Sequence, residues 1–454
     1  MPAVSYKPLG SVEQYLRVYA EPEAALAMHV REHFERAVVV PVFGESADFL
    51  DGYLRAFESA AGQTLCIVVV NAARDADPAL HAANERCFTE LLARMTAPSA
   101  ITQEPAAWLG RLASAESATL LLVDRQSLGV RLPEKQGVGL ARRIGADIAL
   151  SLHGTGKLKS EWIATSDADV ALPADYFAGI ERVGGEAVVV AYPFLHVASG
   201  AADVDRASML YETFLRYYVL GLSWAGSPYA FHTVGSTLAI RADAYAAVRG
   251  FPKRAAGEDF YLLNKLAKVG ALVRPAREPI RIRSRRSARV PFGTGRAVTD
   301  LCADFAQGND MRLYDPRSFT ALRAALRCLA DFAAYRDLER ALGCIDDAGP
   351  ARGVVATFLE RLQVRAVLAE SAREAPTELQ LYRRLHTWFD AFRTLKLIHA
   401  LRNEVFPALD WRSALKQAEF CRDLSGDDPE AARDALRLQE RELAPVLGPT
   451  LPAR

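Results

Sequence analysis

Short apolar runs rich in β-branched residues alternate with helical patterns through the first half of the chain. Five runs have the length and composition of buried strands: 37–43 (AVVVPVF), 66–70 (CIVVV), 118–123 (ATLLLV), 161–165 (EWIAT) and 187–191 (AVVVA). Three segments between them have apolar residues at helical spacing: 46–60, 84–95 and 138–150. Strands alternating with helices predict an α/β fold with a doubly wound, mostly parallel sheet. Such sheets bind ligands beyond the carboxyl ends of their strands.

The pattern changes to helical periodicity in the second half of the chain. Helices are expected at 204–222 and 259–269, and then, with no further strand runs, at 319–337, 354–370, 378–402 and 428–443. We therefore predict an N-terminal helical extension (1–35), an α/β domain (36–298) and a helical C-terminal domain (299–454). A length of 454 residues also favours more than one domain.

Charge and composition exclude some classes of protein. Lys plus Arg and Asp plus Glu are 55 each, so the net charge is zero, which argues against a general nucleic-acid binder. The first residues lack the basic and apolar regions of a signal peptide, and no apolar run has the length of a membrane span. The six cysteines have no C-x-x-C spacing and fit free thiols in a reducing compartment. A cytoplasmic protein is expected, either free or peripheral to the membrane.

Asp167 and Asp169 follow the apolar run at 161–165 directly. Two carboxylates at a turn after a strand can hold Mg²⁺ or Mn²⁺, hard cations that prefer oxygen ligands and also bind substrate phosphates. Such a metal would neutralise a diphosphate leaving group. The alternative is a solvated Asp turn that caps the helix near Pro173.

Glu258 and Asp259 lie after Gly257, at the start of the helix expected from 259. One of these carboxylates can act as a general base that takes a proton from an acceptor hydroxyl. The alternative is that both only complement the helix dipole, as acidic residues at a helix start ordinarily do.

Several weak motifs occur in one order along the chain. They are the 37–43 strand with Glu45, the 66–70 strand ending at Asn71, KxGxGxARRxG at 135–145, Asp167-x-Asp169, GSTLAIR at 235–241, Gly250-Phe251 and Gly257-Glu258-Asp259. Over residues 35–296 this ordered set resembles the family 2 glycosyltransferases of the GT-A fold. The resemblance implies a nucleotide-diphospho-sugar donor, a divalent metal at Asp167 and Asp169, and Asp259 as the catalytic base, with Glu258 as the fallback. It further implies an inverting reaction and donor-binding roles for Pro41, Val42, Glu45, Asn71, Gly137, Arg142 and Asp167.

The chain departs from the family pattern at three places. Asn71 stands where family members often carry Asp, and the segment 72–117 is long. A Q-x-x-R-W element is absent, which argues for transfer of a single sugar. An Arg-rich stretch at 281–296 is present instead, and we expect Arg286 and Arg289 to bind the donor diphosphate, since guanidinium groups match phosphate oxygens. A solvated basic loop or a nucleic-acid patch is the alternative for this stretch.

The predicted function is thus a metal-dependent glycosyltransferase. A catalytically inactive nucleotide-sugar-binding scaffold is the alternative from another class, and a sugar nucleotidyltransferase ranks third because the Gly-rich loop with a basic residue after the first strand is missing. The acceptor, either a small glycoside or a lipid at the cytosolic membrane face, and the oligomeric state are not indicated by the sequence.

Overall fold

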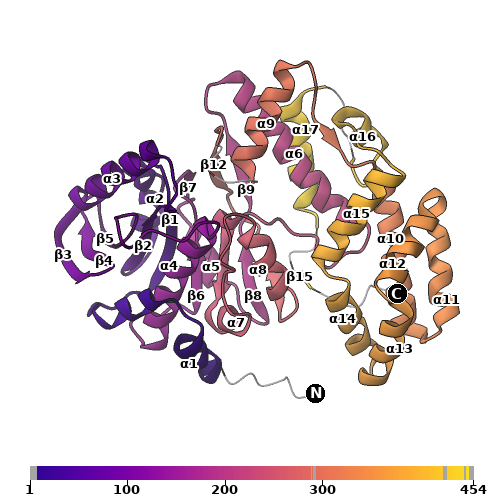
Figure 1. Cartoon of the computed structure of the whole chain (residues 1–454), viewed down its shortest axis with the longest axis horizontal. Coiled ribbons are helices and arrows are strands. Elements are labelled where there is room, and N and C mark those ends of the chain that lie inside the picture. The colour runs from indigo at the N-terminus through magenta and orange to yellow at the C-terminus, as the bar shows by residue number, and fades with distance from the viewer. Residues whose placement is uncertain (1–7, 288, 290–292, 423–426, 444–445, 449–454) are drawn as a thin grey trace. The chain divides into compact units, whose positions relative to one another are not determined.

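The computed structural model describes residues 8–287, 289, 293–422, 427–443 and 446–448. The chain forms two compact units (Figure 1). The first unit consists of Met1–Ser199 and Thr233–Arg296, and the second of Gly200–His232 and Ala297–Arg454. The predicted domain boundaries differ from this division, because residues 1–35 belong to the first unit and the segment 200–232 belongs to the second.

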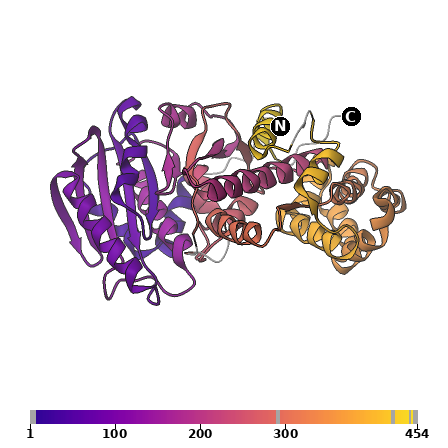
Figure 2. The same ribbon diagram turned by 90° about the horizontal axis from the view of Figure 1, so that it is seen from above.

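A large mixed sheet organises the first unit. Along this sheet the strands follow one another in the order β11 (Ala271–Val273), β8 (Ala187–Ala191), β10 (Leu238–Arg241), β6 (Trp162–Thr165), β1 (Arg36–Val42), β2 (Thr64–Asn71), β5 (Ala115–Arg125), β4 (Ala106–Leu112) and β3 (Met95–Gln103). The pairs β1–β2, β1–β6, β2–β5 and β8–β11 are parallel. The prediction of an α/β fold with a mostly parallel sheet is confirmed. Figure 2 shows the indigo and purple strands of this unit side by side.

The direction of winding reverses at β1. The chain passes from β1 to β2 and then to β5 on one side, whereas β6 pairs with the opposite side of β1. The carboxyl ends of β1 and β6 therefore flank a topological switch point. In open α/β sheets this is the place where ligands bind.

Antiparallel strands were not expected from the sequence. The long segment 72–117 contains helix α3 (Pro78–Ala93) and then the antiparallel strands β3 and β4 at one edge of the sheet. β10 lies antiparallel between β6 and β8. A second, small sheet has the order β7 (Val170–Ala171), β12 (Ile280–Arg283) and β9 (Phe194–Val197). Short apolar runs do not specify strand direction, which is set by the pairing partner.

Helices cover the sheet of the first unit. The segment 46–60, expected as one helix, forms the 3₁₀ helix Ala47–Gly52 and helix α2 (Leu54–Ser59). α4 (Gly137–Gly154) packs against β1, β2 and β6. A Cβ atom on Gly145 would lie 2.3 Å from a methyl group of Val39, so only glycine allows this close approach of helix and strand. The other helices of this unit are α5 (Tyr176–Glu181), α7 (Ala242–Ala247) and α8 (Glu258–Leu266).

The N-terminal segment is tied to the first unit through Asp147, a buried residue of α4. Tyr15, in α1 (Pro8–Val18), and Tyr245, in α7, donate hydrogen bonds of 2.8 and 2.7 Å to Asp147 Oδ1. The backbone N–H of Glu21 donates to Asp147 Oδ2 at 2.8 Å. Residues 1–35 are therefore not an independent extension, at least over the part of the segment that the structure describes.

Replacing Asp147 by alanine is expected to release this segment. Tyr15 and Tyr245 would lose the acceptor of their buried hydroxyl groups. Each buried donor left without an acceptor lowers the free energy of unfolding by about 1–3 kcal/mol. Hydrogen exchange followed by mass spectrometry should show faster exchange in the peptides of α1 than in the wild type. Tyr245→Phe removes one donor and leaves the Tyr15 bond, so a smaller change is expected. Unchanged exchange of α1 in Asp147→Ala would contradict this role.

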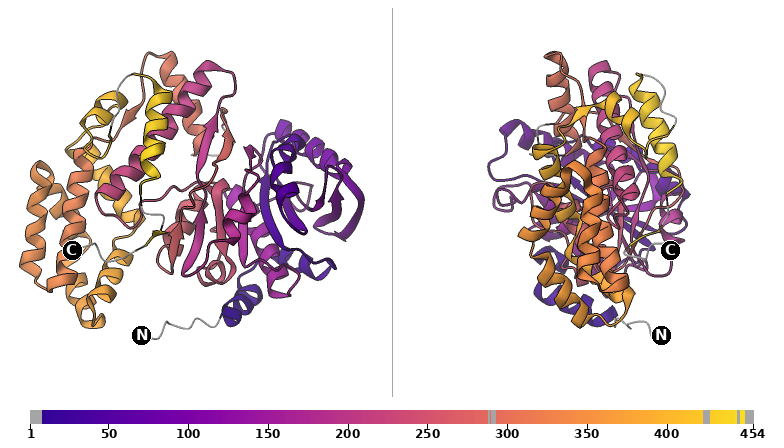
Figure 3. Two further views of the ribbon diagram at one scale, coloured as in Figure 1. Left: turned by 180° about the vertical axis from the view of Figure 1, so that it is seen from behind. Right: turned by 90° about the vertical axis from the view of Figure 1, so that its right-hand side faces the viewer.

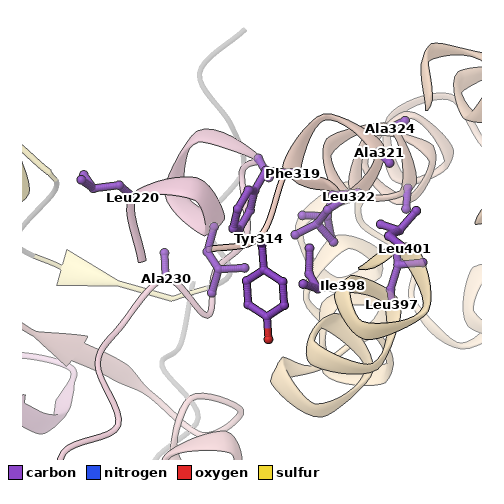
Figure 4. Packing of buried hydrophobic residues seen from close by; sticks show 14 of the residues in the cluster. Leu220, Ala230, Tyr314, Phe319, Ala321, Leu322, Ala324, Leu397, Ile398 and Leu401 are labelled. Atoms are coloured by element: carbon purple, nitrogen blue, oxygen red, sulfur yellow. The ribbon is translucent and has the colours of Figure 1, made fainter. Parts of the chain in front are cut away.

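The second unit is helical and has its own apolar core (Figure 3). Figure 4 shows Leu220 and Ala230 from the 200–232 segment in one cluster with Tyr314, Phe319 and Leu401. Helix α6 buries its apolar face in this core, which explains why its segment belongs to the second unit. The helices are α6 (Ala202–Trp224), α9 (Thr294–Ala306), α10 (Arg317–Tyr335), α11 (Leu338–Gly343), α12 (Arg352–Arg361), α13 (Val364–Glu374), α14 (Glu378–Trp388), α15 (Ala391–Glu404), α16 (Trp411–Gln417) and α17 (Pro429–Glu440).

Two of the long helices expected in this unit are each divided. The segment 354–370 breaks at Gln363, whose φ of 56° is left-handed, and 378–402 breaks between α14 and α15 at Phe389 and Asp390. No helix within the described ranges has both the length and the apolar character that a membrane span needs.

Candidate active site at the switch point of the sheet

Arg142 lies at the centre of the candidate site, on α4. Its side chain is 2% exposed, and all three guanidinium nitrogens bond to oxygens of the protein. Nη2 donates to Asp167 Oδ1 at 2.7 Å and Nε to Glu258 Oε1 at 3.2 Å. Nη1 donates to the carbonyl oxygens of Ser166 and Gly235, both at 3.2 Å. The two acidic motifs, some ninety residues apart in sequence, thus meet at one guanidinium group.

This geometry changes the expected role of Arg142. The sequence predicts a donor-binding residue, but the side chain is buried and fully engaged with the protein. We infer that Arg142 instead fixes the positions of Asp167 and Glu258. Gly235 makes room for it, because a Cβ atom there would lie 2.9 Å from Arg142 Nη2 and 3.5 Å from Asp259 Oδ2.

Glu258 and Asp259 lie in different environments at the start of α8. Glu258 is 4% exposed and bonded to Arg142, whereas Asp259 is partly exposed. Asp259 Oδ1 accepts a hydrogen bond of 2.7 Å from the backbone N–H of Phe260. Loss of surrounding water, together with the charge of Glu258, raises the pKa of Asp259 to about 7. Of the two carboxyl groups, Asp259 is therefore the better placed to exchange a proton with a ligand.

Asp169 and Glu45 share a guanidinium group, that of Arg285. Arg285 donates from Nε to Asp169 Oδ2 and from Nη2 to Glu45 Oε1, both at 2.8 Å, and the shortest ion-pair distance to Asp169 Oδ2 is 2.6 Å. Arg289 Nη1 donates to the same Glu45 oxygen at 2.7 Å and also to the carbonyl oxygen of Phe43. Burial raises the pKa of Glu45 to about 7. The chain segments that follow β1 and β6 are thus joined by arginines at the switch point.

In the Arg-rich stretch, the arginines that contact the site are not the two that the sequence predicts. Arg289 contacts the segment after β1, close to the other site residues, while the side chain of Arg286 is exposed. Arg285, which the sequence reasoning did not single out, carries the contact to Asp169. The alternation of residue types along this segment was the available signal. Ile280, Ile282 and Ser284 are buried at every second position, so Arg285 lies on the opposite face of the strand. Phosphate binding by Arg286 and Arg289 stays a prediction.

Asn71 connects the ends of β1 and β2. Its side-chain nitrogen Nδ2 donates to the backbone carbonyl oxygen of Val42 at 2.9 Å. Its backbone carbonyl oxygen accepts a hydrogen bond of 2.8 Å from the side-chain Nδ2 of Asn84. Asn84 Oδ1 in turn accepts from the backbone N–H of Gly44 at 2.7 Å. This network shapes the turn that presents Glu45.

The other predicted donor-binding residues contribute to packing. The side chains of Pro41 and Val42 are buried in β1. Gly137 begins α4 against Ala255, whose Cα atom would lie 3.3 Å from a Cβ on that glycine. Contacts of Pro41, Val42, Asn71 and Gly137 with a donor stay predictions.

The acidic residues of the site offer few ligands for a divalent metal by themselves. Within the described residues, no group of three or more His, Cys, Asp and Glu side chains has an arrangement that could hold a metal ion. Asp167 and Asp169 nevertheless offer carboxylate oxygens, and Asp169 already binds a cation, the guanidinium of Arg285. Mg²⁺ in proteins is typically held by one or two carboxylates together with substrate phosphates and water. Asp167 and Asp169 fit that kind of site, in which the ligand completes the shell.

Comparison with known proteins does not assign the chain to a family. No family model matches the sequence, and no curated protein matches it. The structure is similar to that of S. aureus TarS 1–349 in complex with UDP-GlcNAc, with a TM-score of 0.35 and 13% identity over 83% of this chain and 99% of that one. It is also similar to the mannosyltransferase PcManGT from Pyrobaculum calidifontis in complex with GDP-Man and Mn²⁺, with a TM-score of 0.33 and 16% identity over 87% of this chain and 95% of that one. These scores are too low to define an activity.

Proposed function

We propose that the chain is a glycosyltransferase of the GT-A type that moves a single sugar from a nucleotide-diphospho-sugar to an acceptor hydroxyl. One observation carries this proposal. At the switch point of the sheet Arg142 joins Asp167 after β6 to Glu258 at the start of α8, and Arg285 joins Asp169 after β6 to Glu45 after β1. Asp259 follows Glu258 directly in the first turn of α8. Ligands of such sheets bind at this point.

The residues at the switch point have different roles in the proposed reaction. Asp259 accepts the proton of the acceptor hydroxyl while the hydroxyl oxygen attacks the anomeric carbon. The bond from that carbon to the diphosphate oxygen breaks, and the electron pair leaves with the nucleoside diphosphate. A single displacement of this kind inverts the anomeric configuration.

A divalent cation at Asp167 and Asp169 would supply charge neutralisation for the departing diphosphate. The protein itself contributes further positive charge, because Arg285 and Arg289 lie beside Asp169 and Glu45. Asp167 is held in place by Arg142, and its carbonyl oxygen accepts a hydrogen bond of 2.7 Å from Tyr53.

Donor binding tests the proposal. Calorimetry and thermal shift with a panel of UDP- and GDP-sugars, with and without Mn²⁺, should identify a ligand that raises the melting temperature by mass action. Asp169→Ala should remove the Mn²⁺-dependent part of the affinity and leave the fold intact. Asp51→Ala is the matched control, because Asp51 is an exposed acid of the same unit paired with Arg94.

Two results would count against the proposal. If no nucleotide-sugar binds or is hydrolysed by the protein, the transferase assignment fails. If a donor binds with equal affinity in Asp169→Ala and in the wild type at saturating Mn²⁺, the metal-dependent part of the assignment fails.

A further inference from the structure

Arg285 holds the carboxylate that the proposed metal would need. Its Nε atom donates a charge-assisted hydrogen bond of 2.8 Å to Asp169 Oδ2, and its Nη2 atom forms an ion pair with the same oxygen at 2.6 Å. The exposed fractions of the two side chains are 31% for Arg285 and 18% for Asp169, so solvent screens the pair only in part. A metal ion at Asp169 Oδ2 would have to take over this oxygen.

The register of the small sheet brings the segment of Arg285 close to Asp169. β12 runs antiparallel to β7, with Ile282 opposite Val170. The ladder continues one residue further, since the backbone N–H of Arg283 donates to the carbonyl oxygen of Asp169 at 2.8 Å. Arg285 follows two residues later, so its backbone lies close to the turn at 167–169, and its side chain reaches Asp169 from there.

Glu45 holds the same guanidinium group from the other side. Glu45 Oε1 accepts from Arg285 and also from Arg289, which is anchored to the carbonyl oxygens of Phe43 and Gly44. Arg285 thus lies between two carboxylates that belong to different strands of the switch point. The guanidinium group of Arg285 therefore pairs with Asp169, one of the carboxylates that a divalent metal would use as a ligand.

We propose that Arg285 is the internal counter-ion of Asp169 and that it competes with the divalent metal for this carboxylate. The inference rests on the proposed metal role of Asp169 and deepens it. Metal binding then requires Arg285 to leave Asp169, so the arginine sets the metal concentration at which the site is filled. The competition is specific to Arg285, because Arg289 contacts Glu45 and not Asp169 in the described structure.

Binding of Mn²⁺ alone tests this competition, measured by calorimetry and by the loss of the electron paramagnetic resonance signal of free Mn²⁺. Arg285→Gln is expected to bind Mn²⁺ about tenfold or more tightly than the wild type, since hydrogen bonds to charged groups are strong enough for such a change. Arg285→Lys should fall between the two, because its ammonium keeps the charge but not the planar fork. Asp169→Ala in the Arg285→Gln background should lose the gain.

Two arginine controls separate a specific contact from a general change of charge. Arg289→Gln removes the same charge beside Glu45, and Arg281→Gln removes it from an exposed position of β12. Both should change Mn²⁺ affinity by much less than Arg285→Gln does. A gain in Arg289→Gln as large as that in Arg285→Gln would overturn the proposal in favour of a general electrostatic effect.

Failure of the competition can be told apart from failure of the proposed function. Equal Mn²⁺ affinity in the wild type and in Arg285→Gln, with loss in Asp169→Ala, would keep the metal site and overturn the competition. Absence of Mn²⁺ binding in every variant, even with UDP or GDP present, would overturn both the competition and the metal site. Hydrolysis of nucleotide-sugars by the wild type, measured in parallel at saturating Mn²⁺, reports on the transferase proposal whatever the affinity of Arg285→Gln for the metal.

Discussion

Asp259→Asn is expected to lower turnover by about 10²–10⁴-fold, the usual contribution of general base catalysis. The amide keeps the size of the side chain but cannot accept the proton of the acceptor hydroxyl. Affinity for the donor should be retained, because the residue contacts neither Asp167 nor Asp169 through a hydrogen bond that the structure records. Steady-state kinetics of transfer, or of donor hydrolysis before an acceptor is known, measures the loss, and calorimetry with the donor measures the retained affinity.

Glu258→Gln is the matched comparison for this prediction. Glu258 is buried against Arg142, whereas Asp259 is partly exposed, so the geometry assigns the base to Asp259. A loss of turnover confined to Glu258→Gln, with near-normal Asp259→Asn, would reverse the assignment. If neither change matters, the base lies elsewhere, and a product of retained configuration would exclude the single displacement.

The pH dependence of the reaction follows from the raised pKa of Asp259. A base must be deprotonated to work, and burial raises the pKa of this carboxyl to about 7. The value of kcat/KM should therefore fall as the pH drops below about 7 and reach a plateau above it. Glu45, whose pKa burial also raises to about 7, is unchanged in Asp259→Asn, so the residual activity of this variant should lose only the part of the step that Asp259 causes.

Arg142→Met is expected to cause the largest loss of stability among the site variants. Removing the guanidinium leaves Glu258 buried without its cation and takes the 2.7 Å hydrogen bond from Asp167. Breaking a buried ion pair by removing one partner typically costs about 3–5 kcal/mol. Urea denaturation should show the decrease in the free energy of unfolding, and donor affinity should fall as well, because Asp167 is no longer held.

Two further variants test whether the contacts of Arg142 are responsible. Arg142→Lys keeps the charge but cannot make bonds to both acids and both carbonyl oxygens, so an intermediate loss is expected. Arg111→Met, at an exposed position of β4, should be nearly neutral. Stability of Arg142→Met equal to that of Arg111→Met would show that the buried network contributes nothing.

The strand-forming runs and the acidic motifs could be predicted from the sequence because their signals are local. A run such as AVVVPVF has the length and β-branched composition of a buried strand wherever it occurs, and it forms β1. Asp167 and Asp169 follow β6 and Asp259 lies in the first turn of α8, as their positions after a strand and a glycine indicated. The α/β class and the expectation of chemistry at the strand ends needed no further information.

The tertiary structure alone decided which residues meet at those strand ends. Arg142 has the same local pattern whether it contacts a donor or two acidic side chains, and only the packing of α4 against the sheet brings it to Asp167 and Glu258. The sequence does not distinguish Arg285 from the arginines around it. The pairing of β12 with β7 brings its segment close to Asp169, with which it forms an ion pair. The segment 200–232 likewise has an amphipathic pattern, which does not indicate the elements that its apolar face contacts. The apolar core that it shares with the C-terminal helices assigns it to the second unit. Periodicity records which face of an element is apolar, whereas the contacts of that face depend on chain segments far away in sequence.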